Sequence, residues 1–554
     1  MNHLIKRIRE SIIGGRASIR TPFGLKPLVY ADYTASGRAL GFIEDFIRAQ
    51  VLPFYANTHT ETSFTGAHTT RLREEARREI KRAVNAGPEH KVIFCGAGAT
   101  AAVHKLIDIL NLRLPADLMR KYKLHEQIPP RERPVVFVGA YEHHSNELPW
   151  RESIAEVVRI PLNPDDTLDL DALESELRAH TDRPLKIGSF SAASNVTGIK
   201  TDVDRVTRLL HRHGALAFWD YAAAAPYTAI DMTGEQDVAG DSGKDAVFIS
   251  PHKFIGGPGT PGLLIVRDKL LKNTIPALPG GGTVLYVTPQ DHRYLDDSER
   301  REEGGTPAII ESIRAGLVFK LQRQVGTGEI EKRETDFIRR ALARWSHCDN
   351  IEILGNPTAP RLAIASLRFK HRGKDLHYGF VTALLNDLFG IQARGGCSCA
   401  GPYGHHLLRM DMAYSKALEA QLVQGHMVLR PGWVRLNFNY FIDEDTFEYL
   451  VRAVELVAEY GWRLLPYYRF DTARGIWRFQ DTQPNTTSLS QLDFLNLGPD
   501  EGSSDKVEHA LAACLAEAEE ELRREHRQGE RYALKLPEEV EKLRWFVLPQ
   551  EIAL

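Results

Sequence analysis

Residues 245–266, D-A-V-F-I-S-P-H-K-F-I-G-G-P-G-T-P-G-L-L-I-V, form the stretch of the chain that decides the fold. Residues 246–250 and 263–266 are short apolar runs that predict two strands, and the glycines and prolines between them predict a sharp turn. Lys253 stands in that turn. Burial in a mostly apolar turn would disfavour its ammonium form and lower its pKa, which would make the amine a usable nucleophile.

This stretch alone leaves two interpretations of Lys253 open. A lone lysine beside glycines is usually a solvated residue of a β-turn. The alternative is a Schiff-base lysine for pyridoxal phosphate. That alternative requires a phosphate cradle, a partner for the ring and an acidic group for the pyridine nitrogen elsewhere in the chain.

Upstream of the turn, apolar runs alternate with segments of helical periodicity. The predicted strands cover residues 91–95, 134–138, 185–190 and 215–220, and the predicted helices between them cover residues 101–110, 167–180 and 202–213. This alternation predicts an α/β domain with a mostly parallel sheet that helices cover on both faces. Ligands of such sheets bind beyond the carboxyl ends of the strands.

Five residues with useful chemistry stand at or just after predicted strand ends: Thr100, His143, Asn195, Asp220 and Lys253. Their shared position predicts that they form one site. Each also has a simpler interpretation. Residues 96–100, G-A-G-A-T, suit either a phosphate cradle or a tight turn. Asp220 suits either a pyridinium partner or a helix cap, and His143 either a ring that stacks on a cofactor or a surface histidine.

The remaining chain suggests four parts. We expect an amino-terminal segment at 1–27, a large α/β domain at 28–300, a linking helix with a smaller α+β domain at 301–465, and an extension of unknown role at 466–554. Helices are predicted at 308–325 and 328–346. The Arg/Glu-rich run at 71–82 predicts a solvated helix face, and residues 504–527 predict a charged helix that is solvated or docks elsewhere.

A C-S-C sequence at 397–399 follows Arg394 and two glycines. One cysteine could be a nucleophile on an exposed loop near positive charge, or both could be ordinary reduced cysteines. A metal site with His405 and His406 is not expected, because a one-residue gap is tighter than the spacing usual for structural zinc. Arg394 and Arg435 suit either a substrate carboxylate or a structural role.

Composition excludes several classes of function. The chain has 554 residues with a net charge of -3, 43% hydrophobic and 26% charged residues, as expected for a globular protein that binds neither nucleic acid nor an anionic membrane. We find no apolar run long enough to span a membrane and no apolar signal segment at the start. Five cysteines, an odd number, fit a reducing compartment, so we expect a cytoplasmic protein.

Taken in order, the motifs resemble the fold-type I pyridoxal-phosphate enzymes of aminotransferase class V, and within them the cysteine desulfurase and selenocysteine lyase group. The amino-terminal domain of molybdenum-cofactor sulfurases is similar. The segments that carry the resemblance are Y-A-D-Y-T-A-S-G at 30–37, G-A-G-A-T at 96–100, Y-E-H-H-S-N-E-L-P-W at 141–150, S-N-V-T-G at 194–198, W-D-Y-A-A-A at 219–224, S-P-H-K at 250–253, E-G-G-T-P at 303–307 and R-G-G-C-S-C-A at 394–400.

This resemblance implies a large domain with a mostly parallel, seven-stranded type of sheet. It also implies that Lys253 holds pyridoxal phosphate as an internal aldimine and later carries protons. His143 would stack on the ring as part of the catalytic centre, and Asp220 would pair with the pyridine nitrogen. Thr306 would reach the phosphate of the partner subunit, so a homodimer is implied. The implied cofactor-binding residues are Ala99, Thr100, His143, Asn195, Asp220, Ser250, His252, Lys253 and Thr306.

The resemblance also implies how a small amino-acid substrate is handled. Arg435 matches the arginine for the substrate carboxylate, with Arg394 and Asn195 as further substrate contacts. Cys399, rather than Cys397, falls on the sulfur-accepting cysteine. It would attack the substrate sulfur, carry a persulfide and pass sulfur to an acceptor protein. The expected activity is therefore that of a cysteine desulfurase acting on L-cysteine or a related amino acid.

Three departures from the family pattern keep other functions open. Ala223 stands where the desulfurases have a glutamine, and Cys397-Ser398 stands where relatives often have two histidines. The interval from Cys399 to Arg435 is longer than usual and predicts an extra helix near the mouth of the active site. Alternatives are a class V lyase, decarboxylase or epimerase that needs no cysteine nucleophile, and a non-catalytic interaction protein of the same fold.

Overall fold

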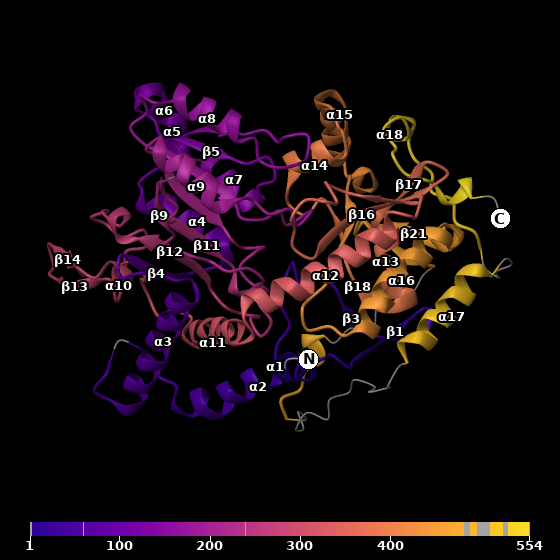
Figure 1. Ribbon diagram of the computed structural model, residues 1–554, viewed down its shortest axis with the longest axis horizontal. Coiled ribbons are helices and arrows are strands. Elements are labelled where there is room, and N and C mark those ends of the chain that lie inside the picture. Colours follow the sequence, from indigo (N-terminus) through magenta and orange to yellow (C-terminus); the bar gives the residue numbers. More distant parts are fainter. Residues whose placement is uncertain are drawn as a thin grey trace. The chain divides into compact units, whose positions relative to one another are not determined.

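The computed structural model describes residues 3–58, 60–238, 240–480, 488–495, 510–524 and 530–552. The chain divides into two compact units. Unit 1 comprises Met1–Leu4, Tyr33–Arg333 and Thr358–Leu362, whereas unit 2 comprises Ile5–Asp32, Glu334–Pro357 and Ala363–Leu554. Figure 1 shows most of unit 1 in indigo to magenta and most of unit 2 in orange to yellow.

Unit 1 is built on a seven-stranded sheet. In spatial order its strands are β4 (His90–Cys95), β12 (Gly262–Arg267), β11 (Ala246–Ile249), β8 (Leu216–Asp220), β7 (Lys186–Ser191), β5 (Val135–Val138) and β6 (Glu156–Arg159). Only β12 runs antiparallel to its neighbours. This sheet confirms the predicted α/β fold and its mostly parallel, seven-stranded sheet.

Helices cover both faces of this sheet, as the apolar strands require. Successive residues of β8 show the alternation, because side chains of a strand point to opposite faces. Phe218 packs in a core with Val103 and Leu106 of α4 (Gly98–Ile109). The next residue, Trp219, points to the opposite face, where its indole N–H donates to Thr207 of α9 (Val203–Arg212) at 3.0 Å.

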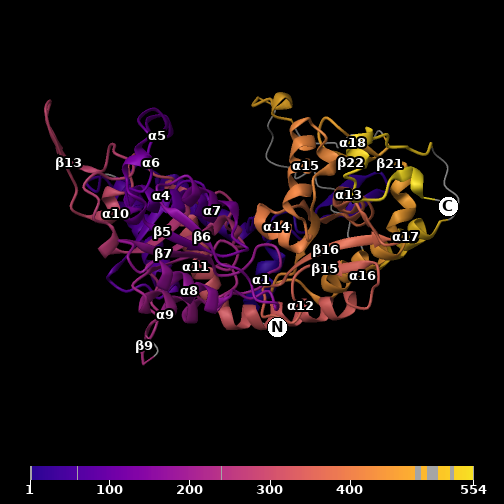
Figure 2. The same cartoon turned by 90° about the horizontal axis from the view of Figure 1, so that it is seen from above.

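The other elements of unit 1 surround this sheet. The helices are α2 (Gly41–Phe46), α3 (Phe64–Ala83), α5 (Ala116–Tyr122), α6 (Leu124–Gln127), α7 (His144–Arg151), α8 (Leu170–Ala179), α10 (Ser298–Arg301) and α11 (Ile309–Val325), and α12 (Thr327–Trp345) continues from unit 1 into unit 2. Two hairpins, β9 (Gln236–Asp237) with β10 (Gly240–Asp241) and β13 (Val284–Val287) with β14 (His292–Tyr294), lie outside the main sheet. The second hairpin projects away from that sheet (Figures 1 and 2).

Unit 2 has the predicted α+β character. Its antiparallel sheet has the order β15 (Ile351–Ile353), β16 (Ile364–His371), β20 (Trp433–Asn437) and β19 (Arg394–Gly396), and β17 (Lys374–Leu376) also pairs with β16. Its main helices are α13 (Tyr378–Phe389), α16 (Glu444–Tyr460) and α17 (Leu511–Arg523). Smaller elements are α1 (His3–Glu10), β1 (Ser18–Thr21), β2 (Gly24–Pro27), β3 (Val29–Tyr30), β18 (Ile391–Gln392), α14 (Gly401–Leu407), α15 (Met412–Val423), β21 (Tyr468–Asp471), β22 (Ile476–Phe479) and α18 (Glu538–Glu541).

Residues beyond 466 contribute to the core of unit 2. The charged helix predicted at 504–527 forms as α17, whose Cys514, Ala518 and Leu522 are buried at the spacing of one helix face. Residues 504–509 and 525–527 of that prediction lie outside the described residues. Trp477 and Phe546 are buried in the same core. Within the described ranges, no helix has both the length and the apolar character that a membrane span requires.

Candidate active site

Eight of the predicted site residues lie in unit 1 beyond the carboxyl ends of its strands. They are Ala99, Thr100, His143, Asn195, Asp220, Ser250, His252 and Lys253, and they are called the strand-end residues below. They follow β4, β5, β7, β8 and β11, which all run in one direction. The fold therefore brings these residues to one edge of the sheet, where ligands of such sheets bind.

The first turn of α4 forms a polar cradle with the residues after β11. The Ala99 amide donates to Ser250 Oγ at 2.8 Å. The N-cap residue Ala97 makes no side-chain cap, and Ser250 Oγ is a side-chain acceptor at this end of the helix, an end where anions bind favourably. Gly98 has a φ of +57°, and a Cβ atom there would lie 2.9 Å from Ser250 Oγ and 3.0 Å from His252 Cε1.

A second group of hydrogen bonds joins this cradle to His143. The exposed Thr100 hydroxyl donates to Ser145 Oγ at 2.7 Å. The Ser145 amide donates to His143 Nδ1 at 3.1 Å, and so His143 caps α7 with its own ring. This bond fixes the direction of the imidazole plane at the edge of the site.

Asp220 is a buried carboxylate at the end of β8. The Ala222 amide donates to Asp220 Oδ1 at 2.7 Å. Burial raises the pKa of Asp220, while the Ala222 hydrogen bond and the charge of Lys253 act to lower it. A buried carboxylate is costly unless a cation or hydrogen-bond donor pairs with it, so this residue suits a protonated ring nitrogen.

The lysine turn is held by backbone hydrogen bonds from the start of unit 1. Pro251–Lys253 forms a 3-10 turn, and Lys253 is half-buried. The Gly37 amide donates to His252 O at 2.8 Å, and the Gly256 amide donates to Arg38 O at 2.7 Å. Burial, followed by the charge of Lys253, lowers the pKa of His252 to about 4, so its imidazole is neutral near pH 7.

Sequence reasoning did not identify Glu142 as part of the site. Its buried carboxylate accepts hydrogen bonds from the Ser191 amide at 3.0 Å, the Ser191 hydroxyl at 2.6 Å and Asn146 Nδ2 at 2.7 Å. Burial raises the pKa of Glu142 to about 7, and the charge of Asp220 acts in the same direction. A carboxylate directly before His143 was the available signal, but its partner Ser191 is distant in sequence.

The predicted substrate arginines belong to unit 2 and share one carboxylate. Arg394 Nε donates to Asp32 Oδ2 and Arg435 Nη2 donates to Asp32 Oδ1, both at 2.9 Å. The two arginines stand directly opposite each other on β19 and β20. Like charges in that position destabilise a sheet, and Asp32 offsets this effect. Asp32 was not predicted to act here, although it stands in the quoted motif at 30–37.

The cysteine loop, residues 394–400, comprises β19 and the four residues after it. Cys397 is half-buried and Cys399 is exposed. Ser398 and Cys399 have φ values of +55° and +56°, a left-handed conformation that costs free energy for residues other than glycine. Cys399 lies within electrostatic range of Arg435. Among the described residues, no group of three or more His, Cys, Asp or Glu side chains could hold a metal ion.

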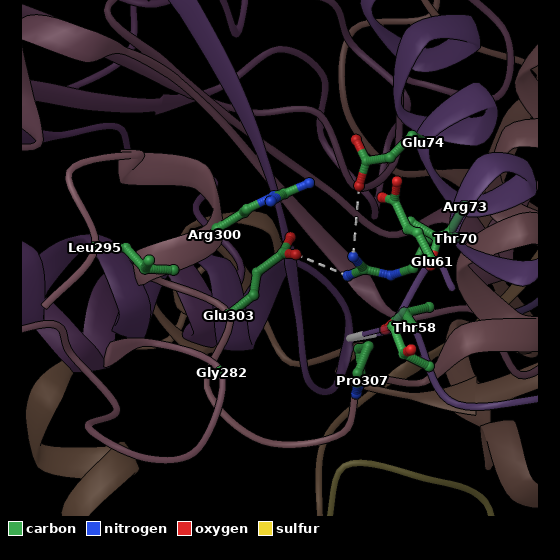
Figure 3. Close-up of a pocket in the computed structure, with 11 residues that line it drawn as sticks. Thr58, Glu61, Thr70, Arg73, Glu74, Gly282, Leu295, Arg300, Glu303 and Pro307 are labelled. Atoms are coloured by element: carbon green, nitrogen blue, oxygen red, sulfur yellow. Dashed lines mark hydrogen bonds and ion pairs between the residues drawn. The ribbon is translucent and has the colours of Figure 1, made fainter. Parts of the chain in front are cut away.

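Thr306 also lies in unit 1, but its side-chain hydrogen bond is with Asn57 and not with a strand-end residue. Its exposed hydroxyl accepts a hydrogen bond from Asn57 Nδ2 at 3.2 Å. It follows Glu303, which lines a cavity of about 330 Å³ with Arg73 and Glu74 (Figure 3). Within the part of the chain that the structure describes, none of the strand-end residues lines this cavity.

The helix face predicted at 71–82 is not wholly solvated. Arg73 and Arg77 of α3 are buried, and both donate to Glu303, at 2.7 and 2.9 Å (Figure 3 shows the Arg73 pair). Although burial acts to raise it, the charges of Arg77 and Arg73 lower the pKa of Glu303 to about 2. The prediction was wrong for these two arginines, because i,i+3 and i,i+4 charge patterns do not reveal a partner from elsewhere in the chain.

The seven-stranded sheet and its helices define a fold-type I α/β protein. Solved structures support this fold. The chain matches the apo cysteine desulfurase of Thermococcus onnurineus with a TM-score of 0.64 at 20% identity, covering 82% of this chain and 97% of that one. It matches the S-sulfonic acid form of an Escherichia coli cysteine desulfurase with a TM-score of 0.61 at 20% identity, covering 82% and 98%.

A family model described as aminotransferase class-V matches residues 29–420, so the chain belongs to the aminotransferase class-V family of enzymes. Curated relatives include a probable cysteine desulfurase of Halalkalibacterium halodurans, 28% identical over 384 residues, which are 68% of this chain and 85% of the relative. A probable cysteine desulfurase of Staphylococcus epidermidis is 27% identical over 388 residues, 68% of this chain and 84% of the relative.

Proposed function

We propose that this chain is a pyridoxal-phosphate-dependent enzyme that removes sulfur from L-cysteine or a related amino acid. One observation carries the proposal: the half-buried Lys253 of unit 1 is within electrostatic range of the buried Asp220 carboxylate, and Ser250 and His252 of the same turn lie against the amino terminus of α4. The names of the curated relatives support desulfuration over the other reactions of the family.

The residues of unit 1 fit this cofactor. The first-turn amides of α4, with Ser250 and His252 beside them, offer donors to a phosphate group, and Gly98 leaves no side chain in the cradle. Asp220 would accept a hydrogen bond from the ring nitrogen, and His143 would stack on the ring with Asn195 beside its edge. When bound, the cofactor supplies an electron sink conjugated to the substrate amine.

Two residues of unit 1 would handle protons and orientation. Lys253 would bind the cofactor through its amine and, once the substrate amine has displaced it, move a proton at Nζ to and from the substrate. The 3-10 turn and its bonds to Gly37 and Arg38 hold the Lys253 backbone while its side chain changes partners. His143 would hold the ring plane, because its Nδ1 already accepts from Ser145.

Cys399 would accept the sulfur. Its thiolate Sγ attacks the substrate sulfur, so an S–S bond forms as the substrate C–S bond breaks and leaves its electron pair on carbon. That carbon takes up a proton to give alanine, and Cys399 carries a persulfide. A thiol acceptor, a protein in the cell or a small thiol in vitro, then removes the outer sulfur. Exposure and the nearby Arg435 suit a reactive thiolate.

Arg435 would bind the substrate carboxylate with Arg394 as a second cation. Both guanidinium groups already contact Asp32, so the substrate carboxylate would share them with that residue. We also propose a homodimer in which Thr306 reaches the partner subunit's phosphate. The described cysteines are free thiols, which supports a reducing, cytoplasmic setting.

The test uses the full chain with pyridoxal phosphate, a panel of amino acids and dithiothreitol, and measures alanine and sulfide. We expect the wild type to release both from L-cysteine. Cys399→Ser should lose at least about 10³-fold in rate, as expected when a nucleophile is removed, whereas Cys397→Ser should retain most activity. Lys253→Ala should abolish turnover and the visible absorption of the loaded protein.

Other results would contradict the proposal in distinct ways. Full sulfide release by Cys399→Ser would exclude the cysteine nucleophile and favour a lyase, decarboxylase or epimerase. A wild-type protein that gains no absorption with pyridoxal phosphate would instead favour a non-catalytic interaction protein of this fold.

A further inference from the structure

The carboxyl-terminal residues 530–552, called the tail, pack against the segment at 400–430 that lengthens the interval before Arg435. The Tyr414 hydroxyl of α15 donates to Leu543 O at 2.8 Å, and the Trp545 indole N–H donates to Leu429 O at 2.9 Å. Figures 1 and 2 both show α18 of the tail beside α15. The two features that depart from the family pattern therefore form one structure within unit 2.

The tail is also anchored to the sheet of unit 2. Phe546 forms a parallel bridge with Asp375 of β17, and the Val547 amide donates to Asp375 O at 2.8 Å. Phe546, Val547 and Leu548 are buried in the core of unit 2. Such anchoring is stronger than that of a fraying chain end, because apolar burial and backbone hydrogen bonds act together.

Trp545 packs on the first residues of α13. Its ring stacks on Tyr378 with centroids 6.2 Å apart and an interplanar angle of 8°, and on His377 at 5.3 Å and 24°. His377 is held from both ring nitrogens: Nδ1 accepts from the Gly379 amide at 3.0 Å, and Nε2 donates to Val428 O at 3.1 Å. Hydrogen bonds therefore fix the His377 ring, and Trp545 stacks on it and on Tyr378.

Tyr378 in turn packs against the base of the cysteine loop. A Cβ atom on Gly395 would lie 2.7 Å from Tyr378 Cδ2, and one on Gly432 would lie 2.9 Å from Tyr378 Cε1. Gly395 is in β19, two residues before Cys397, and Gly432 directly precedes β20. The Tyr378 ring therefore lies against the start of the loop at Gly395 and against Gly432, which leads into the neighbouring strand β20. Cys397 is close enough to influence the electrostatics of Tyr378.

The loop has a conformation that needs such support. Ser398 and Cys399 are two successive non-glycine residues in the left-handed region, which L side chains rarely adopt. Backbone of this kind persists only where the surrounding structure over-determines it. Within the loop itself, β19 contributes only Arg394–Gly396 to the sheet, so packing must supply the rest.

We propose that the tail positions the cysteine loop, residues 394–400, with Trp545 as the positioning residue that acts through Tyr378. The contribution to sulfur transfer rests on the proposed function, whereas the mechanical coupling is a property of unit 2 alone. The extension beyond 466 then contributes to the activity, because its last segment holds the conformation of the loop that carries Cys399.

The experiment compares Trp545→Ala and Trp545→Phe with the matched control Trp462→Ala in the full-length chain. Trp462 is another half-buried tryptophan of unit 2, but its ring stacks on His371 at 4.4 Å rather than on Tyr378. Hydrogen exchange of amides in residues 394–400 is measured by mass spectrometry. Alkylation of Cys397 by iodoacetamide is measured relative to Cys348, a half-buried thiol in the same unit.

We expect Trp545→Ala to accelerate both exchange of the 395–397 amides and relative alkylation of Cys397 by about tenfold, which corresponds to about 1.4 kcal/mol of lost local stability. Trp545→Phe should restore most of the protection, because the stacking ring returns, and Trp462→Ala should change neither rate. Unchanged rates in a folded Trp545→Ala protein would overturn the proposal, as would equal acceleration by Trp462→Ala.

If Trp545→Ala does not fold, Tyr414→Phe decides the question. It removes only the hydroxyl that holds Leu543, and should accelerate exchange in 394–400 by a few-fold; no acceleration would overturn the proposal. Failure of the proposed function is visible separately as absent sulfide release by the wild type. With desulfuration present, Trp545→Ala should lower kcat while the absorption of bound pyridoxal phosphate stays unchanged.

Discussion

The Glu142 carboxyl, one residue before His143, is a titratable group with no solvent contact. It accepts hydrogen bonds from Ser191 and Asn146, and burial raises its pKa from 4.5 to about 7. Asp220, whose pKa is also raised by burial, is near enough to oppose ionisation of Glu142. Two buried carboxyls near one edge of the sheet favour a single negative charge there, which is the charge that a protonated ring nitrogen requires.

At this scale we predict the pH dependence of Glu142→Gln. Because the folded-state pKa of about 7 exceeds the unfolded value of 4.5, the folded state binds the extra proton between these pH values. Its stabilising effect is complete below pH 4.5 and is lost as the pH rises through 7. The free energy of unfolding of the wild type should therefore fall relative to that of Glu142→Gln across this window.

Urea unfolding of both proteins at several pH values measures this difference. Glu152→Gln, an exposed position at the end of the same helix α7, is the matched control and should give a profile parallel to the wild type. Parallel profiles for Glu142→Gln and wild type would show that Glu142 does not take up a proton in the folded protein.

Among the elements, β4 is one of the two edge strands of the main sheet, and side chains cover it. The Val92 amide donates to Glu299 Oε1 at 2.7 Å and the Phe94 amide donates to Glu303 Oε1 at 2.8 Å, while Arg77 donates to Val92 O. Open edge strands are liable to pair with other chains, so these ionic groups both satisfy the backbone and block such pairing. The same contacts hold the segment that leads to Thr306.

For this element we predict that Glu303→Gln destabilises the protein strongly. The substitution retains acceptor capacity for Phe94 but leaves the buried Arg73 and Arg77 with only the partly exposed Glu74 as a counter-charge. Breaking a buried ion pair by removing one partner typically costs about 3–5 kcal/mol. Denaturant unfolding measures the loss. Glu75→Gln on the same helix removes two exposed pairs, with Arg71 and Arg78, and should cost less than about 1 kcal/mol. Equal effects of the two substitutions would mean that the buried cluster adds nothing beyond a surface pair.

On the scale of the whole molecule, the residues beyond 466 belong to the core of unit 2. Tyr468 and Trp477 lie in the same apolar cluster as α13 and α16, and Leu522 and Phe546 extend it. The family model ends at residue 420, so this part of the core is built from sequence that the model does not include. Unit 2 therefore depends for its stability on a segment without a counterpart in the family pattern.

At this scale we predict that Phe546→Ala weakens unit 2. Removing a fully buried phenylalanine typically costs about 3–5 kcal/mol, so native-state hydrogen exchange in α13 and α16 should accelerate. Exchange in the main sheet of unit 1 should change much less. Phe494→Ala, at a phenylalanine that is 80% exposed, is the control and should change exchange in neither unit. An unaltered α13 in Phe546→Ala would contradict a core role for the tail.

Local sequence pattern was sufficient for the architecture of unit 1. The apolar runs at 246–250 and 263–266 form β11 and β12, and the alternation upstream forms the parallel strands, because strands buried on both faces must be apolar throughout. The strand-end residues could be chosen for a similar reason, since parallel strands direct the residues after them to one edge. Their chemical roles, and the place of Thr306 in a dimer, stay predictions.

Local sequence pattern could not predict contacts between residues that are far apart in the chain. Asp32 beside Arg394 and Arg435, Glu303 beside Arg73 and Arg77, and Trp545 beside Tyr378 each join positions more than a hundred residues apart. A run of charged residues looks the same in sequence whether its side chains face water or contact a distant carboxylate. Their burial depends on the segments that pack against them.

The sequence by itself determined the α/β class, the order of the strands along the chain and the candidate lysine, since periodicity and turn chemistry are local properties of the chain. Only the tertiary structure decided which charges are buried, which arginines share a carboxylate, and that Trp545 of the tail stacks on Tyr378. Those outcomes depend on desolvation and on contacts between distant segments, which exist only once the chain has folded.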